Sequence, residues 1–294
     1  MRVLLTGASG FLGRHVLSSL RQRNIETVML GRRRPNEGGF AGFIEADLLA
    51  AGDFAGLARE AQATHLLHLA WYAEHGKYWT SPLNLRWVEV TTRLVEAFCA
   101  AGGKHVVVAG TCAEYDWSHG YCREDSTPLN PATLYGKSKD AARRLAMAVC
   151  SQHQTSCAWG RVFLPFGAGE AGERLIPSLI AAFQGERPPF GVNASAYRDF
   201  LHAADVAEGF IALLQGAANG SYNISSGQPV LVEDLVRALA QLLAADPQAV
   251  LGLTAKRPGE PLLLAGENLR LKALGWEASR SLLQGLQQAV REHS

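Results

Sequence analysis

The stretch TGASGFLG, at residues 6–13, directly follows a short apolar run and places Gly7, Gly10 and Gly13 three residues apart. Such a loop needs glycine for a tight turn, for close approach of the backbone to phosphate oxygens, and for packing of the next helix against the strand. That helix points unpaired N–H groups and the positive end of its dipole at the phosphates. Three glycines alone are a common turn pattern, but their position after a strand predicts a site for the pyrophosphate of a dinucleotide.

Apolar runs alternate with helix-period segments through the first half of the chain. We expect strands at 2–5, 26–30, 42–48, 65–70, 105–110 and 157–163, and helices beginning near Phe11 and over 53–61, 84–101 and 135–151. This alternation is typical of βαβ units, and strands that are apolar throughout indicate a sheet covered on both faces. The predicted fold is α/β, with a Rossmann-type, doubly wound parallel sheet.

The pattern changes after Arg161, where proline and glycine become frequent. Further helices are expected near 174–183, 203–215, 232–244 and 280–291. We expect residues 1–163 to form a Rossmann domain that binds the dinucleotide NAD(P) and is completed by about 197–225. Residues 164–196 and 226–294 are expected to form a smaller C-terminal lobe.

Composition limits the kind of protein. Hydrophobic residues make up 48% and charged residues 19%, enough for a large core, and the formal net charge of +1 gives no reason to expect nucleic acid or membrane as a partner. No apolar run reaches the ~18 residues of a membrane helix, and the chain enters a strand at once, without a signal peptide. The odd number of cysteines, without paired ligand spacing, predicts reduced thiols, no metal site and a cytoplasmic location: Cys99, Cys112, Cys122, Cys150 and Cys157.

The segment MLGRRR lies at the end of the second expected strand, which faces the adenosine ribose in a dinucleotide fold. An acid at this place bonds the ribose 2′-hydroxyl, whereas arginine accommodates a 2′-phosphate. Here Gly31 replaces the acid, and Arg32 and Arg33 offer planar guanidinium groups suited to phosphate. We therefore expect NADP(H) as the preferred cofactor, with NAD(H) possible; the alternative is a solvated basic loop.

The segment LYGKSK places Tyr135 and Lys139 one helical turn apart, at the expected start of a helix. An ammonium near a tyrosine lowers the tyrosine pKa and makes it a usable general acid or base. Upstream, Thr111 ends a strand with a hydroxyl that can bond a substrate oxygen. These residues predict proton transfer at a carbonyl or alcohol.

Several motifs occur in one order along the chain: TGASGFLG, ADL at 46–48, HLA at 68–70, GTCAEY at 110–115, YGKSK at 135–139, RDFLHAADVA at 198–207, YNISSG at 222–227, RPGE at 257–260 and LGW at 274–276. Together they resemble the extended short-chain dehydrogenase/reductase superfamily, in its NAD(P)-dependent nucleotide-sugar epimerase/dehydratase family, over nearly the whole chain. The resemblance implies that the smaller lobe binds the substrate. It also implies a homodimer through the helices at 84–101 and 135–151.

The resemblance assigns site residues as well. The implied catalytic triad is Thr111, Tyr135 and Lys139. The implied cofactor residues are Gly7, Ser9, Gly10, Phe11, Leu12, Gly13, Arg32, Arg33, Asp47, Leu48, Leu69, Ala70, Tyr135 and Lys139. The implied substrate residues are Thr111, Cys112, Arg198 and Arg257, the two arginines as clamps on the diphosphate. Their alternative role is pairing with Asp199 and Glu260.

Two departures from the family pattern bear on the reaction. Dehydratases of this family carry acidic residues directly after the catalytic threonine, where this chain has Cys112 and Ala113. Glu114 is one position later and, by strand alternation, should point elsewhere. The missing acids disfavour dehydration. The second departure is Leu164, which replaces an asparagine of the family that contacts substrate, so this substrate contact is not expected.

Three features allow a structural interpretation as well as a functional one. The aromatic loop AWYAEHGKYW, residues 70–79, could stack on substrate and supply Glu74 or His75 as a second acid or base, or could be a packed lid or dimer contact. His15 and His105 have the positions of structural residues. Cys112 could be reactive, but buried cysteines are more often inert.

The leading hypothesis is an NADP(H)-dependent oxidoreductase that acts on the sugar of a nucleoside-diphosphate hexose, with reduction of a 4-keto-(deoxy)hexose as the preferred reaction. The alternative is an NAD(P)-dependent nucleotide-sugar 4-epimerase. An alternative of another class is a non-catalytic dinucleotide-binding sensor, which the presence of both Tyr135 and Lys139 disfavours.

Overall fold

The computed structural model describes residues 1–34, 38–216, 218–253, 255 and 259–293. Within these residues, seven parallel strands form one sheet in the order β11-β7-β5-β4-β1-β2-β3. The strands of this sheet are β1 (Arg2–Thr6), β2 (Glu26–Gly31), β3 (Gly42–Glu45), β4 (His65–His68), β5 (His105–Thr111), β7 (Ser156–Val162) and β11 (Gly220–Ile224). From β1 the chain builds the sheet outward on one side through β2 and β3, and then continues on the other side of β1 with β4. Sheets of this kind bind ligands in the crevice that this change of side leaves at the carboxyl ends of β1 and β4.

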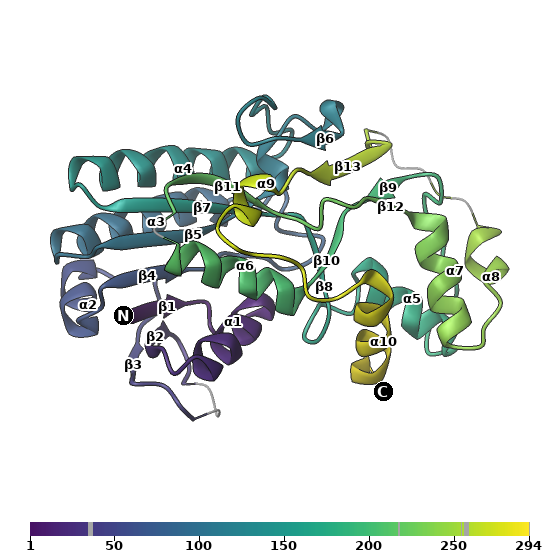
Figure 1. Cartoon of the computed structure of the whole chain (residues 1–294), viewed down its shortest axis with the longest axis horizontal. Helices are drawn as coiled ribbons and strands as arrows, with labels where there is room; N and C mark the ends of the chain where they lie inside the picture. The colour runs from purple at the N-terminus through teal and green to yellow at the C-terminus, as the bar shows by residue number, and fades with distance from the viewer. Residues whose placement is uncertain (35–37, 217, 254, 256–258, 294) are drawn as a thin grey trace.

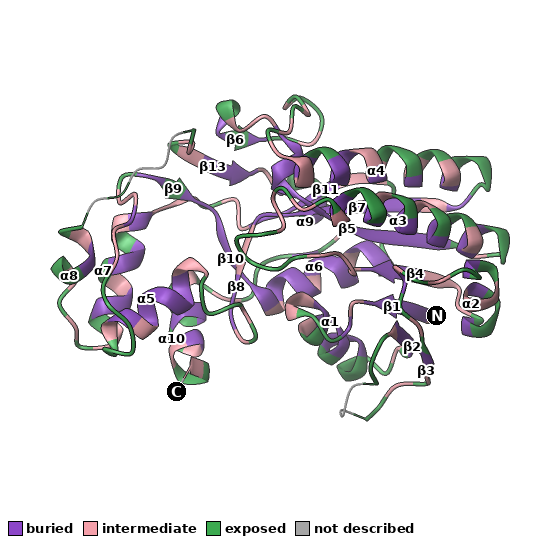
Figure 2. Cartoon of the chain, turned by 180° about the vertical axis from the view of Figure 1, so that it is seen from behind, coloured by how far each residue is buried: buried purple, intermediate pink, exposed green. Residues whose placement is uncertain are grey.

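Helices cover both faces of the sheet (Figure 1). One face is packed by α1 (Phe11–Gln22) and α6 (Ala203–Gln215), and the other by α2 (Phe54–Ala61), α3 (Leu83–Ala100) and α4 (Leu134–Gln152). Because both faces are covered, central strands are apolar throughout, and all seven residues of β5 are buried (Figure 2).

A smaller lobe lies at one end of the sheet (Figure 1). Its elements are a parallel pair, β8 (Leu164–Phe166) with β10 (Phe200–His202); a four-stranded sheet, β12 (Val230–Leu231), β9 (Tyr197–Arg198), β13 (Leu263–Gly266) and β6 (Tyr121–Cys122); and the helices α5 (Leu175–Phe183), α7 (Val232–Leu242), α8 (Gln248–Leu251) and α10 (Leu282–His293). Phe166, Leu179, Leu239 and Leu286 belong to its separate core. The short helix α9 (Leu269–Lys272) packs near β11, and two 3-10 turns, η1 (Cys112–Glu114) and η2 (Trp117–His119), follow β5.

The predicted α/β, Rossmann-type fold is confirmed. The expected strands and helices of the first half match observed elements to within a few residues. The small sheet with β6 was not predicted, and it joins residues of the first 163 to the C-terminal part of the chain. Among the described helices, none is long and apolar enough to cross a bilayer.

Candidate functional site

The glycine loop between β1 and α1 is closed so tightly that side chains do not fit. Gly7 has φ +77°, and a Cβ there would lie 2.7 Å from the backbone nitrogen of Ala70. A Cβ on Gly13 would lie 1.9 Å from the carbonyl oxygen of Gly7. The N-cap of α1, Gly10, provides no side-chain hydrogen bond to the first turn. The free N–H groups of this turn therefore fit a pyrophosphate.

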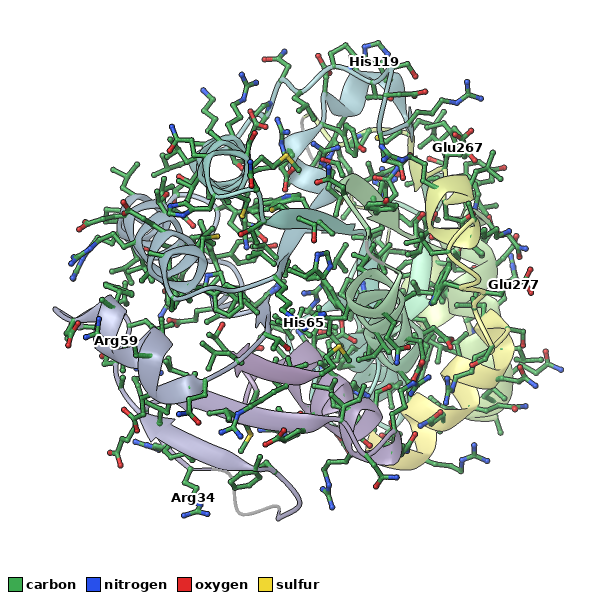
Figure 3. All side chains as sticks on the ribbon, turned by 60° about the vertical axis from the view of Figure 1, so that its left-hand side comes forward. Arg34, Arg59, His65, His119, Glu267 and Glu277 are labelled. Atoms are coloured by element: carbon green, nitrogen blue, oxygen red, sulfur yellow. The ribbon has the colours of Figure 1, made fainter. Side chains whose placement is uncertain are left out.

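The β2 end, Gly31 to Arg34, is open. A Cβ on Gly31 would meet no atom within 4 Å, so an acidic side chain would fit there without steric conflict. Arg32 and Arg33 are exposed. The guanidinium of Arg34 lies 5.2 Å from the centre of the Phe40 ring, and Figure 3 shows Arg34 at the edge of the molecule. The space and the charges suit a ribose with or without a 2′-phosphate.

The remaining predicted cofactor residues follow the strands next to β1 and β2. Asp47 is exposed just after β3, where its Oδ1 accepts a hydrogen bond from the Leu49 N–H at 3.0 Å, and Leu48 is buried. Leu69 and Ala70 follow β4, and the Ala70 N–H donates to Thr6 Oγ1 at 3.3 Å. These residues lie at the carboxyl edge of the sheet, as the dinucleotide fold requires.

Thr111 is the last residue of β5 and caps η1. Its Oγ1 accepts a hydrogen bond from the Ala113 N–H at 3.2 Å, and its own N–H donates to Glu114 Oε1 at 2.9 Å. The Glu114 side chain points elsewhere, as predicted, but strand alternation is not the reason, because the strand ends at Thr111. A 3-10 turn sends Glu114 back under the strand instead.

Glu114 is fully buried, and its carboxylate makes structural contacts. Its carboxylate forms an ion pair with Arg161 at 2.7 Å and accepts a hydrogen bond from Trp159 Nε1 at 2.8 Å. Both side chains of the ion pair are at most 1% exposed. A carboxylate held this way is not available to move a substrate proton, which agrees with the prediction against dehydration. Burial raises the pKa of the neighbouring Cys112 thiol, which disfavours the reactive thiolate.

Tyr135 lies in the first turn of α4, whose N-cap Thr133 accepts a hydrogen bond from the Gly136 N–H. Burial raises the pKa of Tyr135, Tyr78 adds to the effect, and a side-chain hydrogen bond with Thr111 opposes it. The structure therefore brings Thr111 and Tyr135 together. The predicted net lowering of the Tyr135 pKa was wrong, because burial outweighs the effects that oppose it.

Lys139 follows one turn later on α4 and is 3% exposed. Its Nζ donates a hydrogen bond to the Ala109 carbonyl oxygen at 2.8 Å and lies 3.9 Å from the centre of the Trp71 ring. Burial lowers the pKa of Lys139 to about 7, and the charge of Glu114 opposes this shift.

The aromatic loop surrounds Tyr135. The rings of Tyr78 and Trp79 lie 4.8 Å and 5.7 Å from the Tyr135 ring, edge to face. The Tyr135 N–H donates to the Trp79 carbonyl oxygen at 3.1 Å. Glu74 is exposed and pairs with Lys77, so neither of these two side chains is enclosed with Tyr135. In this structure the loop is a packed wall of the site.

Two buried side chains that sequence reasoning missed fix this wall. Asn84 on α3 accepts a hydrogen bond from Trp71 Nε1 at 2.8 Å and donates to the Tyr78 carbonyl oxygen at 2.7 Å. His68 lies between Thr6 Oγ1 and Thr91 Oγ1, at 2.7 and 3.0 Å, and burial lowers its pKa to about 3. His68 begins the HLA motif, but nothing local to it or to Asn84 shows which distant groups these side chains contact.

Arg198 on β9 is buried and paired. Its Nη2 donates to Glu260 Oε1 at 2.7 Å, and its Nη1 donates to the Tyr197 carbonyl oxygen at 2.8 Å. The alternative of pairing with Glu260 therefore applies to Arg198. Asp199 instead accepts hydrogen bonds from the loop at 226–227. Arg257 lies outside the described residues.

The loop between β8 and α5 lies beside the start of α1. A Cβ on Gly169 would lie 3.9 Å from a ring carbon of Phe11. The Glu170 side chain is 4% exposed, pairs with Arg174 at 2.9 Å, and leaves Oε2 without a partner. Burial raises the pKa of Glu170 to about 7. Leu164, at the family's asparagine position, is the first residue of β8.

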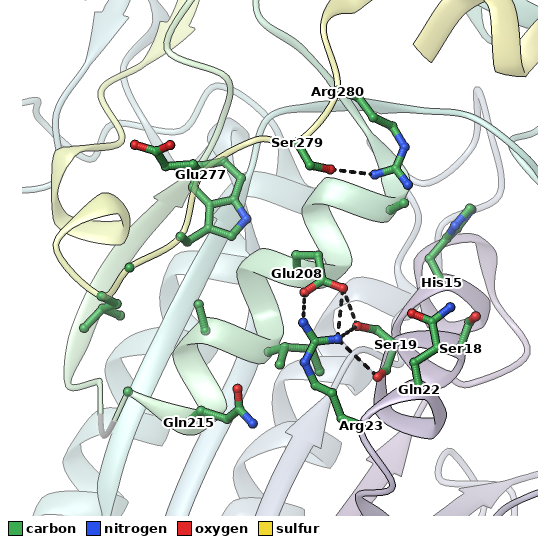
Figure 4. Close-up of a pocket in the computed structure, with 17 residues that line it drawn as sticks. His15, Ser18, Ser19, Gln22, Arg23, Glu208, Gln215, Glu277, Ser279 and Arg280 are labelled. Carbon is green, nitrogen blue, oxygen red and sulfur yellow. Dashed lines mark hydrogen bonds and ion pairs between the residues drawn. The ribbon is translucent and has the colours of Figure 1, made fainter. Parts of the chain in front are cut away.

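A cavity of about 590 Å³ lies elsewhere, between α1, α6 and the segment 274–280 (Figure 4). Arg23 pairs with Glu208, and Arg280 pairs with Asp205. None of the predicted site residues lines this cavity. The predicted structural roles of His15 and His105 fit their bonds to the carbonyl oxygens of Ala168 and Leu213, both 2.9 Å long.

The arrangement can exchange a proton with an alcohol or carbonyl through Tyr135, beside the hydroxyl of Thr111. The described residues hold no cluster of His, Cys, Asp or Glu able to bind a metal ion. The chemistry that these side chains support is acid–base transfer next to a bound dinucleotide.

Residues 3–225 match the NAD dependent epimerase/dehydratase family. The chain is 26% identical, over 97% of its length and 89% of the relative, to UDP-glucose 4-epimerase of Azospirillum brasilense. It is 24% identical to dTDP-D-glucose 4,6-dehydratase of Mus musculus, over 98% and 87% of the two chains.

Solved structures agree. MoeE5 in complex with UDP-glucuronic acid and NAD is 30% identical, with a TM-score of 0.88 over 99% of this chain and 98% of that one. The UDP-glucose 4-epimerase of Thermus thermophilus, in complex with NAD, shares the fold at 23% identity, with a TM-score of 0.86 over 100% and 99% of the chains. The chain therefore belongs to the NAD dependent epimerase/dehydratase family, and it is an enzyme of the extended short-chain dehydrogenase/reductase type.

Proposed function

We propose that this enzyme inverts the C4 carbinol of a UDP-hexose, as an NAD(P)-dependent 4-epimerase. The observation that carries the proposal is the grouping of Thr111, Tyr135 and Lys139 without an available carboxylate beside them. Glu114, the one acid of this segment, is neutralised by Arg161. Such a site supports oxidation and reduction at a carbinol, but not the proton removal that starts an elimination.

The glycine loop and the carboxyl ends of β2, β3 and β4 are proposed to hold the cofactor. The described residues assigned to it are Gly7, Ser9, Gly10, Phe11, Leu12, Gly13, Arg32, Arg33, Asp47, Leu48, Leu69, Ala70, Tyr135 and Lys139. The nicotinamide, when bound, accepts and returns the hydride. The glycine contacts support this assignment, because a side chain at Gly7 or Gly13 would collide with the backbone that forms the tight loop between β1 and α1.

Tyr135 is the proposed acid and base. Its phenolate oxygen accepts the proton of the C4 hydroxyl during oxidation, and the resulting phenol returns a proton to the C4 oxygen during reduction. Thr111 donates a hydrogen bond to the same oxygen and holds it in place. Lys139, as the ammonium, stabilises the tyrosinate form. The aromatic wall of Tyr78 and Trp79 excludes water from this exchange.

The proposed substrate class is a UDP-sugar, supported by the ligands named for MoeE5 and by the curated 4-epimerases. We propose that Arg198 contacts the diphosphate from the smaller lobe. In the described structure Arg198 is paired with Glu260, so one guanidinium nitrogen would exchange or share its partner when the substrate binds. Arg257 and Cys112 are the other proposed substrate residues.

A second candidate is an NADPH-dependent reductase of a 4-keto-(deoxy)hexose. The β2 end favours it, because Gly31 removes the acid that NAD-binding sites use and Arg32 and Arg33 are exposed. A reductase needs a cofactor that leaves after each turnover, whereas an epimerase regenerates its cofactor in the same cycle.

One experiment separates these reactions. Purified enzyme is incubated with UDP-glucose and each dinucleotide, and the sugars are analysed by NMR spectroscopy. The expected product is UDP-galactose without net change of the nicotinamide. Consumption of NADPH only when a 4-keto sugar nucleotide is supplied would establish the reductase instead. Turnover of neither substrate would reject both candidates.

We further propose a division of labour and an assembly. Residues 1–163 with 197–225 would bind the dinucleotide, while 164–196 and 226–294 would bind the sugar nucleotide. The chain is proposed to form a homodimer through α3 and α4, whose outer surfaces expose Leu85 and Leu145 to 59% and 45%. A two-fold interface pairs such patches with themselves. Sedimentation of the Leu145→Glu variant as a monomer, beside a dimeric parent protein, is the expected result; a monomeric parent would reject the dimer.

A further inference from the structure

Lys139 is a buried cation whose near contacts are neutral. Its ammonium lies 3.9 Å from the centre of the Trp71 indole and 2.8 Å from the Ala109 carbonyl oxygen. Among the described residues, no carboxylate forms an ion pair with it. A buried ammonium without a charged partner tends to lose its proton. The group that stabilises the charge of Lys139 therefore determines whether the lysine is an ammonium in this site.

The Trp71 ring is fixed in its place over Lys139. Its Nε1 donates to Asn84 Oδ1 at 2.8 Å, and its ring stacks on Trp87 with centres 6.0 Å apart and planes at 26°. Asn84 is itself fully buried and bound to the carbonyl oxygens of Tyr78 and Ser81. The ring cannot turn away from Lys139 without breaking these bonds.

We propose that Trp71 is a positioning residue, whose indole face holds Lys139 in the charged form beside Tyr135. The proposal rests on the role given to Lys139 in the proposed function. An aromatic face attracts a cation most strongly where both are cut off from water, and tryptophan does so better than tyrosine or phenylalanine. This contact replaces the counterion that a buried lysine would otherwise need.

The other described titratable groups around Lys139 do not balance its charge. Glu114 from η1 favours the charged lysine, but its carboxylate is already paired with Arg161. His68 from β4 is neutral, since burial and Lys139 lower its pKa to about 3. Burial raises the pKa of Tyr135 on the same helix, which disfavours a negative charge there.

A double-mutant cycle measures the contact without using the reaction. Trp71→Leu, Lys139→Met and the double variant are unfolded in urea at about pH 6 and about pH 10, on either side of the range where lysine loses its proton. We expect Trp71→Leu to destabilise the enzyme more at the lower pH, since the charged lysine then loses the ring. In the Lys139→Met background this pH difference should vanish. A cycle whose coupling is independent of pH overturns the proposal.

The pH dependence of kcat/KM tests whether the contact matters to turnover. Trp71→Leu should move the alkaline limb to lower pH by about one unit, and Trp71→Phe should restore part of the shift. Trp276→Leu is the matched control, because its buried indole bonds the Asp205 carbonyl oxygen at the separate cavity of Figure 4, away from the predicted site residues, and the limb should stay in place. Coupling in unfolding with an unmoved limb would overturn the positioning role. Coupling with no turnover of any UDP-sugar by the parent enzyme would reject the proposed function alone.

Discussion

The catalytic end of the site and the β2 end are constructed in opposite ways. Thr111 and Lys139 are 8% and 3% exposed, and each has hydrogen-bond partners before any ligand is present. At the β2 end, Arg32 and Arg33 are exposed, and Gly31 leaves open space. Groups that transfer protons need fixed geometry in advance, whereas charges that attract a phosphate act over longer distances and tolerate motion. The proposed acid–base residues thus have partners before any ligand is present, whereas the proposed phosphate contacts are exposed to solvent.

The largest expected effect comes from Tyr135→Phe at the catalytic end, which we call the rigid end because its side chains have partners before any ligand is present. The ring and its packing remain, but the proton-transfer group is lost, so turnover should fall by roughly 10²–10⁴-fold while cofactor affinity changes little. Steady-state kinetics and dinucleotide titration measure the two quantities. Near-normal turnover would remove Tyr135 from its assigned role and weaken the contrast between the two ends.

Arg161→Leu tests whether the buried ion pair maintains the rigid end. Glu114 would then be a buried charge without a partner, and the free energy of unfolding should fall by about 3–5 kcal/mol. Urea unfolding measures this loss. The control is Arg161→Leu with Glu114→Gln, which leaves no buried charge and should recover part of the stability. An equal free energy of unfolding for Arg161→Leu and the parent protein would show that the ion pair does not stabilise the fold.

Glu170, in the loop between β8 and α5, gives a pH-dependent prediction. Its folded pKa is raised by burial from 4.5 to about 7, so the stability that the protonated form provides is complete below about pH 4.5 and lost as pH rises through about 7. Glu170→Gln should therefore stabilise the protein at pH ~8, by on the order of 3 kcal/mol, and change little at pH ~4.5. Denaturation at both pH values checks this. The same effect at both would mean that the carboxyl group is not the cause.

The smallest effect is expected at the β2 end. If Arg32 contacts a 2′-phosphate, NADPH should bind more tightly than NADH by roughly 1.5–3 kcal/mol. Gly31→Asp with Arg32→Asn should abolish or invert this preference, and the open space at Gly31 accommodates the new side chain. Dissociation constants at low and high salt measure it, because salt screens exposed contacts. Equal affinities in the parent protein would reduce the basic segment to a solvated loop and strengthen the epimerase over the reductase.

The sequence predicted the rigid end better than its surroundings. Thr111, Tyr135 and Lys139 lie in local motifs at strand ends and helix starts, where spacing and strand order suffice to bring them to one edge. The expected strands and helices of the main sheet were equally readable from hydrophobic periodicity. The four-stranded small sheet was not, because strands as short as the two residues of β9 have no period.

Contacts between distant segments were beyond the sequence as well. Nothing local to Glu114 shows that its carboxylate meets Arg161, or that Trp71 lies on Lys139. Such pairs depend on which loop packs over which helix, and that is set by the complete fold. The sequence therefore predicted candidate reacting groups and missed the distant contacts that surround them.

The gathering of tryptophans at the catalytic end also has an optical consequence. The chain has six tryptophans, and Trp71, Trp79, Trp87 and Trp117 stand in ring contact with one another or with Tyr135. Four of the six indoles thus lie around the proposed proton-transfer residue Tyr135. Reduced nicotinamide absorbs where indole emits, so energy transfer would report its arrival directly, without any attached label.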